Sequence, residues 1–180
     1  MDSTKYKLAD AAKRLMETTS LSRMTVTDIV DEAGLTRQTF YRNFKDKYAL
    51  VNWYFDKLAG QSFKEMGVHR TLRDSLILKF NFIQNEKVFF KQAFKSTDYN
   101  SVVQYDYNYI LNFYTDMIAH KTGKVLSPEI TFILKLYCHG SIAMTVEWSN
   151  QGMKESSESM ADNLIHALPR DLEKLLCDVL

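Results

Sequence analysis

Residues that can recognise nucleic acid are concentrated in TRQTFYR, residues 36–42. Guanidinium and amide groups such as those of Arg37, Gln38 and Arg42 can bond to base edges in a major groove, and hydroxyl groups can bond to phosphates. This chemistry requires a helix that turns these side chains outward. Phe40 and Phe44 are spaced i, i+4, which suits them to pin such a helix to an apolar core.

The residues before this stretch predict a helix, a tight turn and a second helix. An amphipathic helix is indicated by apolar residues at i, i+3, i+4 and i+7, namely Val26, Ile29, Val30 and Ala33. Thr25 is the expected N-cap, with Asp28 in the return position of a capping box, and Gly34 can end the helix in the left-handed conformation. Thr36 can cap the second helix. Two helices joined so closely must cross steeply.

The same period also occurs in amphipathic helix pairs that only pack against each other. A helical protein-interaction module without DNA binding is therefore the alternative interpretation. It leaves the outward polar set without a role, namely Arg37, Gln38, Tyr41, Arg42 and Lys47.

The run TVTDIVDEAGLTRQTFYRNFKDKYAL, residues 25–50, resembles the DNA-binding domain of the TetR family of transcriptional regulators. The matching pieces are the Ile-Val and Ala-Gly of the first helix and turn, then Thr-Phe-Tyr, then Phe-Lys-Asp-Lys before a new helix. The resemblance implies that Tyr41 and Lys47 hold phosphates while the short second helix reads bases. The expected DNA-binding residues are Thr25, Thr27, Thr36, Arg37, Gln38, Thr39, Tyr41, Arg42 and Lys47.

Length and composition favour an all-α protein with an N-terminal three-helix DNA-binding domain and a C-terminal helical bundle. The 180 residues are 46% hydrophobic and 25% charged, which is typical of a globular chain, and only two prolines and six glycines interrupt it. The net charge is +1, and the first 50 residues carry nine Lys/Arg against seven Asp/Glu, a net +2. A DNA footprint must therefore depend on a few local residues.

Three consecutive parts are predicted. Residues 1–48 form the helix-turn-helix domain, beginning with a helix over 3–19 whose apolar stripe braces the helix pair. Residues 49–69 form a connecting helix that Asp46 caps, with Lys47 and the first-turn amides as a small anion site. Residues 70–180 form a dimerisation and effector domain. The connecting helix would act as a lever, because movement of its far end would rotate the helix pair.

Aromatic residues crowd the chain after the connecting helix begins. Mixed aromatic surface with hydroxyl groups suits a small organic effector, and the proposed pocket consists of Trp53, Phe82, Tyr105, Tyr107 and Tyr109. The simpler interpretation is a half-buried helix surface with hydroxyls at its rim. A co-regulator protein is the rival input, and the sequence does not distinguish repression from activation.

The last two long helices are predicted to begin at Ser127-Pro128-Glu129 and near Ser156. Resemblance to TetR-like homodimers implies that they pair with their copies in a second subunit, through Tyr137, Ser141, Met144, Thr145, Trp148, Met160 and Leu164. The segment ITFILKLYCHGSIAMTVEWSNQGM also resembles the C-terminal domain of family members that control dihydroxyacetone utilisation.

No enzymatic or metal-binding motif is present in the sequence. The four histidines share no helix face with a carboxylate at ligand spacing, so we expect no catalysis, no cofactor and no metal. Cys138 and Cys177 fit no metal or redox spacing and are expected to be reduced, buried thiols. The absence of a signal-type segment and of a long apolar run favours a cytoplasmic protein without a membrane span.

Overall fold

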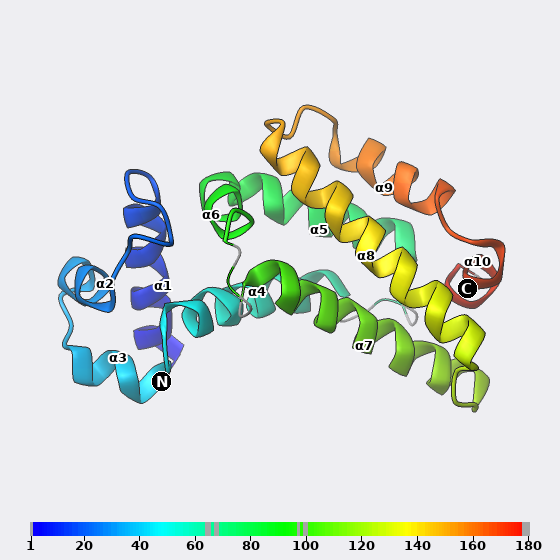
Figure 1. Cartoon of the computed structure of the whole chain (residues 1–180), viewed down its shortest axis with the longest axis horizontal. Helices are drawn as coiled ribbons and strands as arrows, with labels where there is room; N and C mark the ends of the chain where they lie inside the picture. The colour runs from blue at the N-terminus through cyan, green and yellow to red at the C-terminus, as the bar shows by residue number, and fades with distance from the viewer. Residues whose placement is uncertain (1, 64–65, 67–68, 97, 99–100, 178–180) are drawn as a thin grey trace. The chain divides into compact units, whose positions relative to one another are not determined.

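The computed structural model describes residues 2–63, 66, 69–96, 98 and 101–177, and over these residues the chain is helical with no strand (Figure 1). This confirms the all-α prediction. The helices are α1 (Asp2–Met16), α2 (Val26–Ala33), α3 (Arg37–Asn43), α4 (Lys47–Phe63), α5 (Leu72–Asn85), α6 (Lys87–Ala93), α7 (Val102–Thr122), α8 (Pro128–Asn150), α9 (Ser157–His166) and α10 (Arg170–Leu176).

Contacts between residues divide the chain into two compact units. The first unit comprises Met1–Lys57 and Glu86–Gln104, and the second comprises Leu58–Asn85 and Tyr105–Leu180. Helix α4 begins in the first unit and ends in the second. The sequence predicts consecutive parts along the chain, whereas contacts group α6 with the N-terminal helices because α6 packs against α1.

The core of the first unit is formed by the apolar faces of its helices. In α1 the predicted stripe is buried at Leu8, Ala11, Ala12 and Met16 and half-buried at Leu15, and this helix packs against α2. The helix ends at Met16, three residues before the predicted end. From α2 and α3 the core receives Ile29, Val30 and Phe40. The buried stripe thus supports the helix pair as the sequence predicts.

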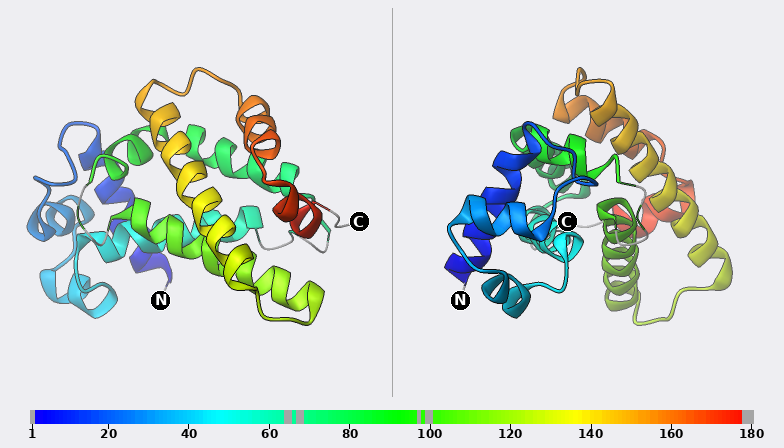
Figure 2. Two further views of the ribbon diagram at one scale, coloured as in Figure 1. Left: turned by 45° about the vertical axis from the view of Figure 1, so that its right-hand side comes forward. Right: turned by 60° about the vertical axis from the view of Figure 1, so that its left-hand side comes forward.

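In the second unit α5 packs against α9, and α10 packs against α8. Helices α8 and α9 run side by side and are joined by the loop 151–156 (Figure 2). The rings of Phe80 on α5 and Trp148 on α8 meet edge to face, with centroids 5.2 Å apart. Ser127 caps α8 by accepting a hydrogen bond from the Ile130 amide at 3.2 Å, with Pro128 in the first turn, as predicted.

The cysteines differ in environment. Cys138 is buried, and burial raises the pKa of its thiol to about 12. Cys177 is exposed at the end of α10, so the prediction that both thiols are buried was wrong for this residue. It is the C-cap residue of α10 and follows the last helical residue, Leu176. Among the described helices, none combines the length and apolar character that a membrane span requires.

Candidate nucleic-acid interface

Hydrogen bonds at the predicted caps define the start and end of α2. Thr25 Oγ1 accepts from the Asp28 amide at 3.1 Å, and Asp28 Oδ2 accepts from the Thr25 amide at 2.8 Å, which completes the capping box. These hydrogen bonds lower the pKa of Asp28. Gly34 ends the helix at φ 64°, a conformation that side chains with a Cβ rarely adopt. The turn is therefore specified locally.

Helix α3 presents a polar face outward and an aromatic face inward. Thr36 Oγ1 accepts from the Thr39 amide at 3.1 Å, which caps the helix as predicted. Phe40 is fully buried and Phe44 is 6% exposed, so both predicted anchors lie in the core. The side chains of Arg37, Gln38, Tyr41 and Arg42 are all exposed. The surface of α3 therefore combines guanidinium, amide and phenol groups over a fixed backbone.

The predicted threonines lie around this face. Thr25, Thr27 and Thr36 are exposed, and Thr39 is half-buried. The hydroxyls of Thr36 and Thr39 lie 3.0 Å apart, and the Thr39 carbonyl accepts from Asn43 Nδ2 at 2.8 Å. These bonds hold the first turn of α3 in one conformation.

Lys47 makes contacts that the sequence did not reveal. Its ammonium group donates to the carbonyls of Ser22 at 2.9 Å and Met24 at 2.8 Å, just before the N-cap of α2. Burial lowers the pKa of this lysine. Asp46 is the predicted cap of α4, and its Oδ1 accepts from the Ala49 amide at 2.7 Å. That amide is therefore already bonded to a carboxylate, and Lys47 ties α4 to the loop before α2.

A second polar cluster joins α1, α4 and the start of α6. Lys13 Nζ donates to Tyr54 Oη at 3.0 Å and to Glu86 Oε1 at 2.9 Å, and Tyr54 Oη donates to the same Glu86 oxygen at 2.7 Å. Burial is the main cause that raises the pKa of Tyr54 to about 12. No local sequence signal links these residues, because they are more than 30 positions apart. The cluster fixes three helices of the first unit to one another.

The residues predicted to form a ligand pocket are distributed over both units. Trp53 belongs to the first unit, where its ring meets Tyr6 and Phe44 with centroid separations of 5.0 and 5.7 Å. The remaining residues, Phe82, Tyr105, Tyr107 and Tyr109, lie half-buried in the second unit. The ring of Tyr107 stacks on His139 at 3.9 Å. The four side chains of the second unit are therefore partly accessible, as both interpretations of the tyrosines require.

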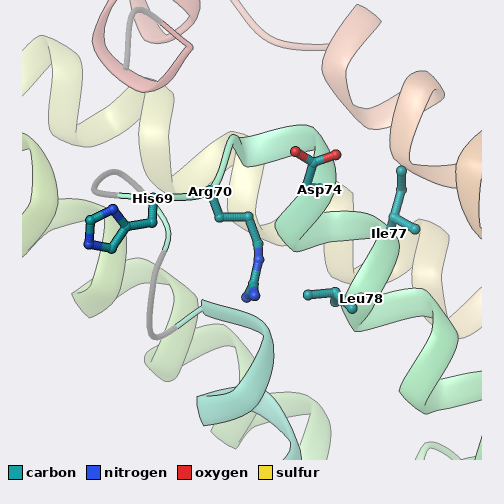
Figure 3. A pocket seen from close by; sticks show the side chains of 5 residues that line it. All are labelled: His69, Arg70, Asp74, Ile77 and Leu78. Carbon is teal, nitrogen blue, oxygen red and sulfur yellow. The ribbon is translucent and has the colours of Figure 1, made fainter. Parts of the chain in front are cut away.

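An open cavity of about 410 Å³ lies beside the start of α5 in the second unit (Figure 3). It is lined by His69, Arg70, Asp74, Ile77 and Leu78, none of which belongs to the predicted pocket. Arg70 extends to the end of α4, where its Nη1 donates to the carbonyls of Gln61 and Ser62 at 3.3 Å each. The arginine therefore satisfies carbonyls at a helix end.

Most of the residues predicted to contact a second subunit point into their own unit. Six of the seven are buried, namely Tyr137, Ser141, Thr145, Trp148, Met160 and Leu164, and Met144 is 50% exposed. Tyr137 Oη donates to the Leu164 carbonyl at 3.0 Å, and Trp148 Nε1 donates to the Glu155 carbonyl at 3.1 Å. These side chains join α8 to α9 and its preceding loop. The opposite face of α8 is exposed and apolar at Phe132 and Leu136.

A buried ion pair in the second unit was not predicted. Lys79 Nζ on α5 lies 2.8 Å from Asp106 Oδ2 and 3.2 Å from Oδ1 on α7, and both side chains are buried. Burial raises the pKa of Asp106, and the ammonium of Lys79 opposes that rise. The available signal was a charged residue within the apolar run LILKFNFI, because a lysine at a core position needs a partner.

In the described part of the chain, no group of three or more His, Cys, Asp or Glu residues is arranged to hold a metal ion. The imidazole ring of His139 stacks on the ring of Tyr107, and His69 lines the open cavity.

Two solved structures share this fold over nearly the whole chain. The dihydroxyacetone kinase operon activator DhaS is 22% identical with a TM-score of 0.68, and the alignment covers 96% of each chain. A TetR transcriptional regulator from Streptococcus agalactiae 2603V is 20% identical with a TM-score of 0.69, covering 94% of this chain and 95% of that one.

A curated relative is the HTH-type dhaKLM operon transcriptional activator DhaS of Lactococcus lactis subsp. lactis (strain IL1403). It is 25% identical over 91 residues, which are 51% of this chain and 49% of the relative. The match thus spans about half the length of that protein.

Family models match both parts of the chain. Residues 8–53 match the model described as bacterial regulatory proteins, tetR family, and residues 70–169 match a TetR model described as transcriptional regulator C-terminal region. The second match covers more than half of the chain, and together they favour DNA binding over the interaction-module alternative. The fold and the family are those of transcriptional regulators rather than of enzymes. The chain belongs to the TetR family of bacterial transcriptional regulators.

Proposed function

We propose that this regulator binds a palindromic operator as a homodimer, with α3 of each protomer in a major groove. A small organic molecule or a co-regulator protein at the second unit modulates its affinity for DNA. The observation that carries the proposal is the geometry of α3, whose arginines and glutamine are exposed while Phe40 and Phe44 are buried beneath them. A two-fold dimer presents the same residues to two half-sites about one helical turn, or a multiple of it, apart.

Within this proposal the contacts divide into two kinds. Arg37, Gln38 and Arg42 reach base edges, where guanidinium and amide groups can form paired hydrogen bonds. Tyr41 and the exposed threonines bond to phosphates, which fixes the register of α3 on the duplex. Lys47 has three N–H donors and uses two of them for the carbonyls before α2, so one remains for a phosphate.

Arg37→Ala and Gln38→Ala should each relax base preference. A paired contact to a base is worth about 1–3 kcal/mol of discrimination, so the ratio of affinities for a selected duplex and a mixed-sequence duplex should fall by about 5- to 150-fold. Operators would be selected from a randomised duplex library with the wild-type protein, and both affinities measured by fluorescence anisotropy.

Arg23→Ala is the matched control, because this exposed arginine belongs to the first unit but lies outside α3. It should leave the affinity ratio unchanged. Selection of no consensus by the wild-type protein, or an unchanged ratio for both α3 variants, would contradict base reading by this helix.

The dimer proposal rests on the exposed side of α8. Phe132 is 69% exposed, Leu136 is 63% exposed and Met144 is 50% exposed, and the exposed Gly140 lies between them. A Cβ added at Gly140 would meet nothing within 4 Å in its own chain, which leaves room for another helix to approach closely. The helix has 23 residues and is therefore about 35 Å long. The exposed stripe from Phe132 to Met144 covers about 18 Å of this length, and such a self-complementary apolar surface suits pairing with its own copy.

Leu136→Glu should shift the protein toward monomer, because two carboxylates related by the two-fold axis would lie in an apolar interface. Loss of an interface hot spot costs about 2 kcal/mol or more, so the dimer dissociation constant should rise by roughly 30-fold or more. Sedimentation velocity over a concentration series measures this constant. Val125→Glu is the control, since Val125 is 94% exposed in the loop before α8. If both variants keep the wild-type dissociation constant, this stripe is not the interface.

The proposed input at the second unit is supported by the half-buried tyrosines of α7. Helix α4 is one continuous helix whose first residues belong to the first unit and whose last residues belong to the second. A ligand or partner protein that binds more tightly to one position of the C-terminal end of α4 would therefore favour the matching position of the first unit. The size of this shift is set by the difference between the ligand's affinities for the two positions.

A further inference from the structure

Two lysines of the first unit lie against one tryptophan. Lys5 Nζ is 5.7 Å from the centroid of the Trp53 ring and 5.6 Å from that of Phe44, and Lys57 Nζ is 5.6 Å from the Trp53 centroid. The Trp53 ring is itself held edge to face by Tyr6 and Phe44. Cations at such distances are attracted to the negative face of an aromatic ring. Lys5 is thus given a preferred position by two rings.

These two lysines carry positive charge that the first unit does not neutralise locally. Within the described residues, no carboxylate forms an ion pair with Lys5 or Lys57, whereas Lys13 and Arg14 of the same helix α1 pair with Glu86 and Glu32. Two like charges near one ring repel each other. An anion bound there would relieve that repulsion, so the cluster is suited to an anionic ligand.

The position of Lys5 relates this cluster to the DNA-binding helix. Phe44 is the residue that ends α3, so the Lys5 ammonium lies near the C-terminal end of that helix. Figure 1 shows the start of α1 beside the connection between α3 and α4. Helix α3 has seven residues and is about 10 Å long, close to the roughly 12 Å width of a major groove. When its exposed face lies in the groove, its end lies near the phosphates of the groove edge.

We propose that Lys5 binds a DNA phosphate at this edge, and that Trp53 is the residue that positions it. The inference rests on the proposed DNA binding and assigns Trp53 a role in the first unit instead of a place in an effector pocket. Phe44 then has two roles in the first unit, because it anchors α3 beside Phe40 and its ring supports the ammonium group of Lys5. Lys57 adds positive potential beside the same ring.

The test uses the full chain and a fluorescein-labelled duplex of mixed sequence, about 30 base pairs or three helical turns long. Mixed sequence isolates the phosphate contribution, which does not depend on bases. Affinity is measured from about 50 to about 200 mM salt for the wild-type protein and for Lys5→Ala, Lys5→Arg and Lys7→Ala. Lys7 is exposed on the same helix two positions away, on a different face, and has no aromatic contact in the described structure, so it is the matched control.

For Lys5→Ala the slope of log affinity against log salt should decrease by about 0.9 for each bound protomer. A fourfold rise in salt should therefore cost this variant about 3.5-fold less affinity per protomer than it costs the wild type. Lys5→Arg should restore the slope, because a guanidinium keeps the charge and stacks on aromatic rings. Lys7→Ala should change the slope less than Lys5→Ala.

Trp53→Leu tests the positioning role. It should weaken binding several-fold without changing the salt slope, since Lys5 keeps its charge but must be ordered at the phosphate. Trp53→Phe, which retains an aromatic face, should bind nearly as the wild type does. Circular dichroism and unfolding midpoints verify that each variant is folded, and the comparison of Lys5 with Lys7 decides the phosphate contact even where Trp53→Leu unfolds.

The outcomes separate this inference from the function on which it rests. If the wild-type protein does not bind the duplex at any salt concentration, the proposed DNA binding fails. If the wild type binds but Lys5→Ala keeps the full slope, or Lys7→Ala changes it equally, only the assignment of Lys5 is overturned. An equal loss of affinity for Trp53→Leu and Trp53→Phe would overturn the aromatic positioning.

Discussion

Lys79→Met should lower the free energy of unfolding by about 3–5 kcal/mol, the usual cost of removing one partner from a buried ion pair. The change leaves the Asp106 carboxylate inside the second unit without the ammonium that lies 2.8 Å away. Since domains are stable by only about 5–15 kcal/mol, this loss is large. Urea denaturation followed by circular dichroism measures it.

The double variant Lys79→Met/Asp106→Leu is the control for this effect. It replaces the pair with apolar groups that suit the surrounding core, and such replacements are often neutral or stabilising. The double variant should therefore recover most of the lost stability. If it is as unstable as Lys79→Met, the loss comes from packing and not from the isolated charge.

The pH dependence of Lys79→Met provides a second check on the same pair. Burial raises the pKa of Asp106, and removal of Lys79 removes the ammonium that opposes the rise. A carboxyl group whose pKa is higher in the folded than in the unfolded state lowers the stability of the folded protein while it is ionised. This cost disappears as the group becomes protonated, so the lost stability should return as the pH falls through the folded-state pKa. The difference from wild type should therefore be smaller at about pH 5 than at about pH 7. A difference that grows on acidification would contradict this account.

Phe40→Ala should cost about 3–5 kcal/mol of stability and abolish binding to every duplex, whatever its sequence. Phe40 is fully buried beneath α3 and meets Phe44 with ring centroids 5.9 Å apart. Removing the ring leaves a cavity under the helix, so the backbone that carries Arg37 and Gln38 is no longer held in one position. Urea denaturation and anisotropy with the mixed-sequence duplex measure the two effects.

Tyr41→Ala is the control for Phe40→Ala, because it should affect DNA binding without lowering the stability of the protein. It removes a ring from the neighbouring position of α3, where the side chain is 51% exposed. The free energy of unfolding should change by no more than about 0.5 kcal/mol, as is usual for exposed sites. If Phe40→Ala and Tyr41→Ala destabilise the protein equally, α3 is not anchored through Phe40.

Several features were predictable because they depend on residues within about four positions of each other. The capping box of Thr25 and Asp28, the glycine that ends α2 and the Thr36 cap are all local hydrogen-bonding patterns. The helical period of 3.6 residues then determines that Phe40 and Phe44 share a face and that Arg37 and Gln38 lie outside it.

Helix α8 illustrates where periodicity is insufficient. Apolar residues occur on all of its sides, so the pattern predicts a helix but not which side packs inward. The structure buries Leu134, Tyr137 and Cys138 and exposes Phe132 and Leu136. The dimer residues chosen from the sequence came mostly from the inward side for this reason. The outward side could be identified only after α9 had been placed against α8.

The sequence alone predicted an all-helical chain of TetR type, with exposed polar side chains on a capped helix that two phenylalanines anchor. Only the tertiary structure decided the partners of Lys47, Trp53 and Lys79. Lys47 reaches carbonyls 23 and 25 positions away, Trp53 meets Lys5 across two helices, and Lys79 pairs with Asp106 27 positions along the chain. Such contacts depend on how helices pack, and no local spacing encodes that geometry.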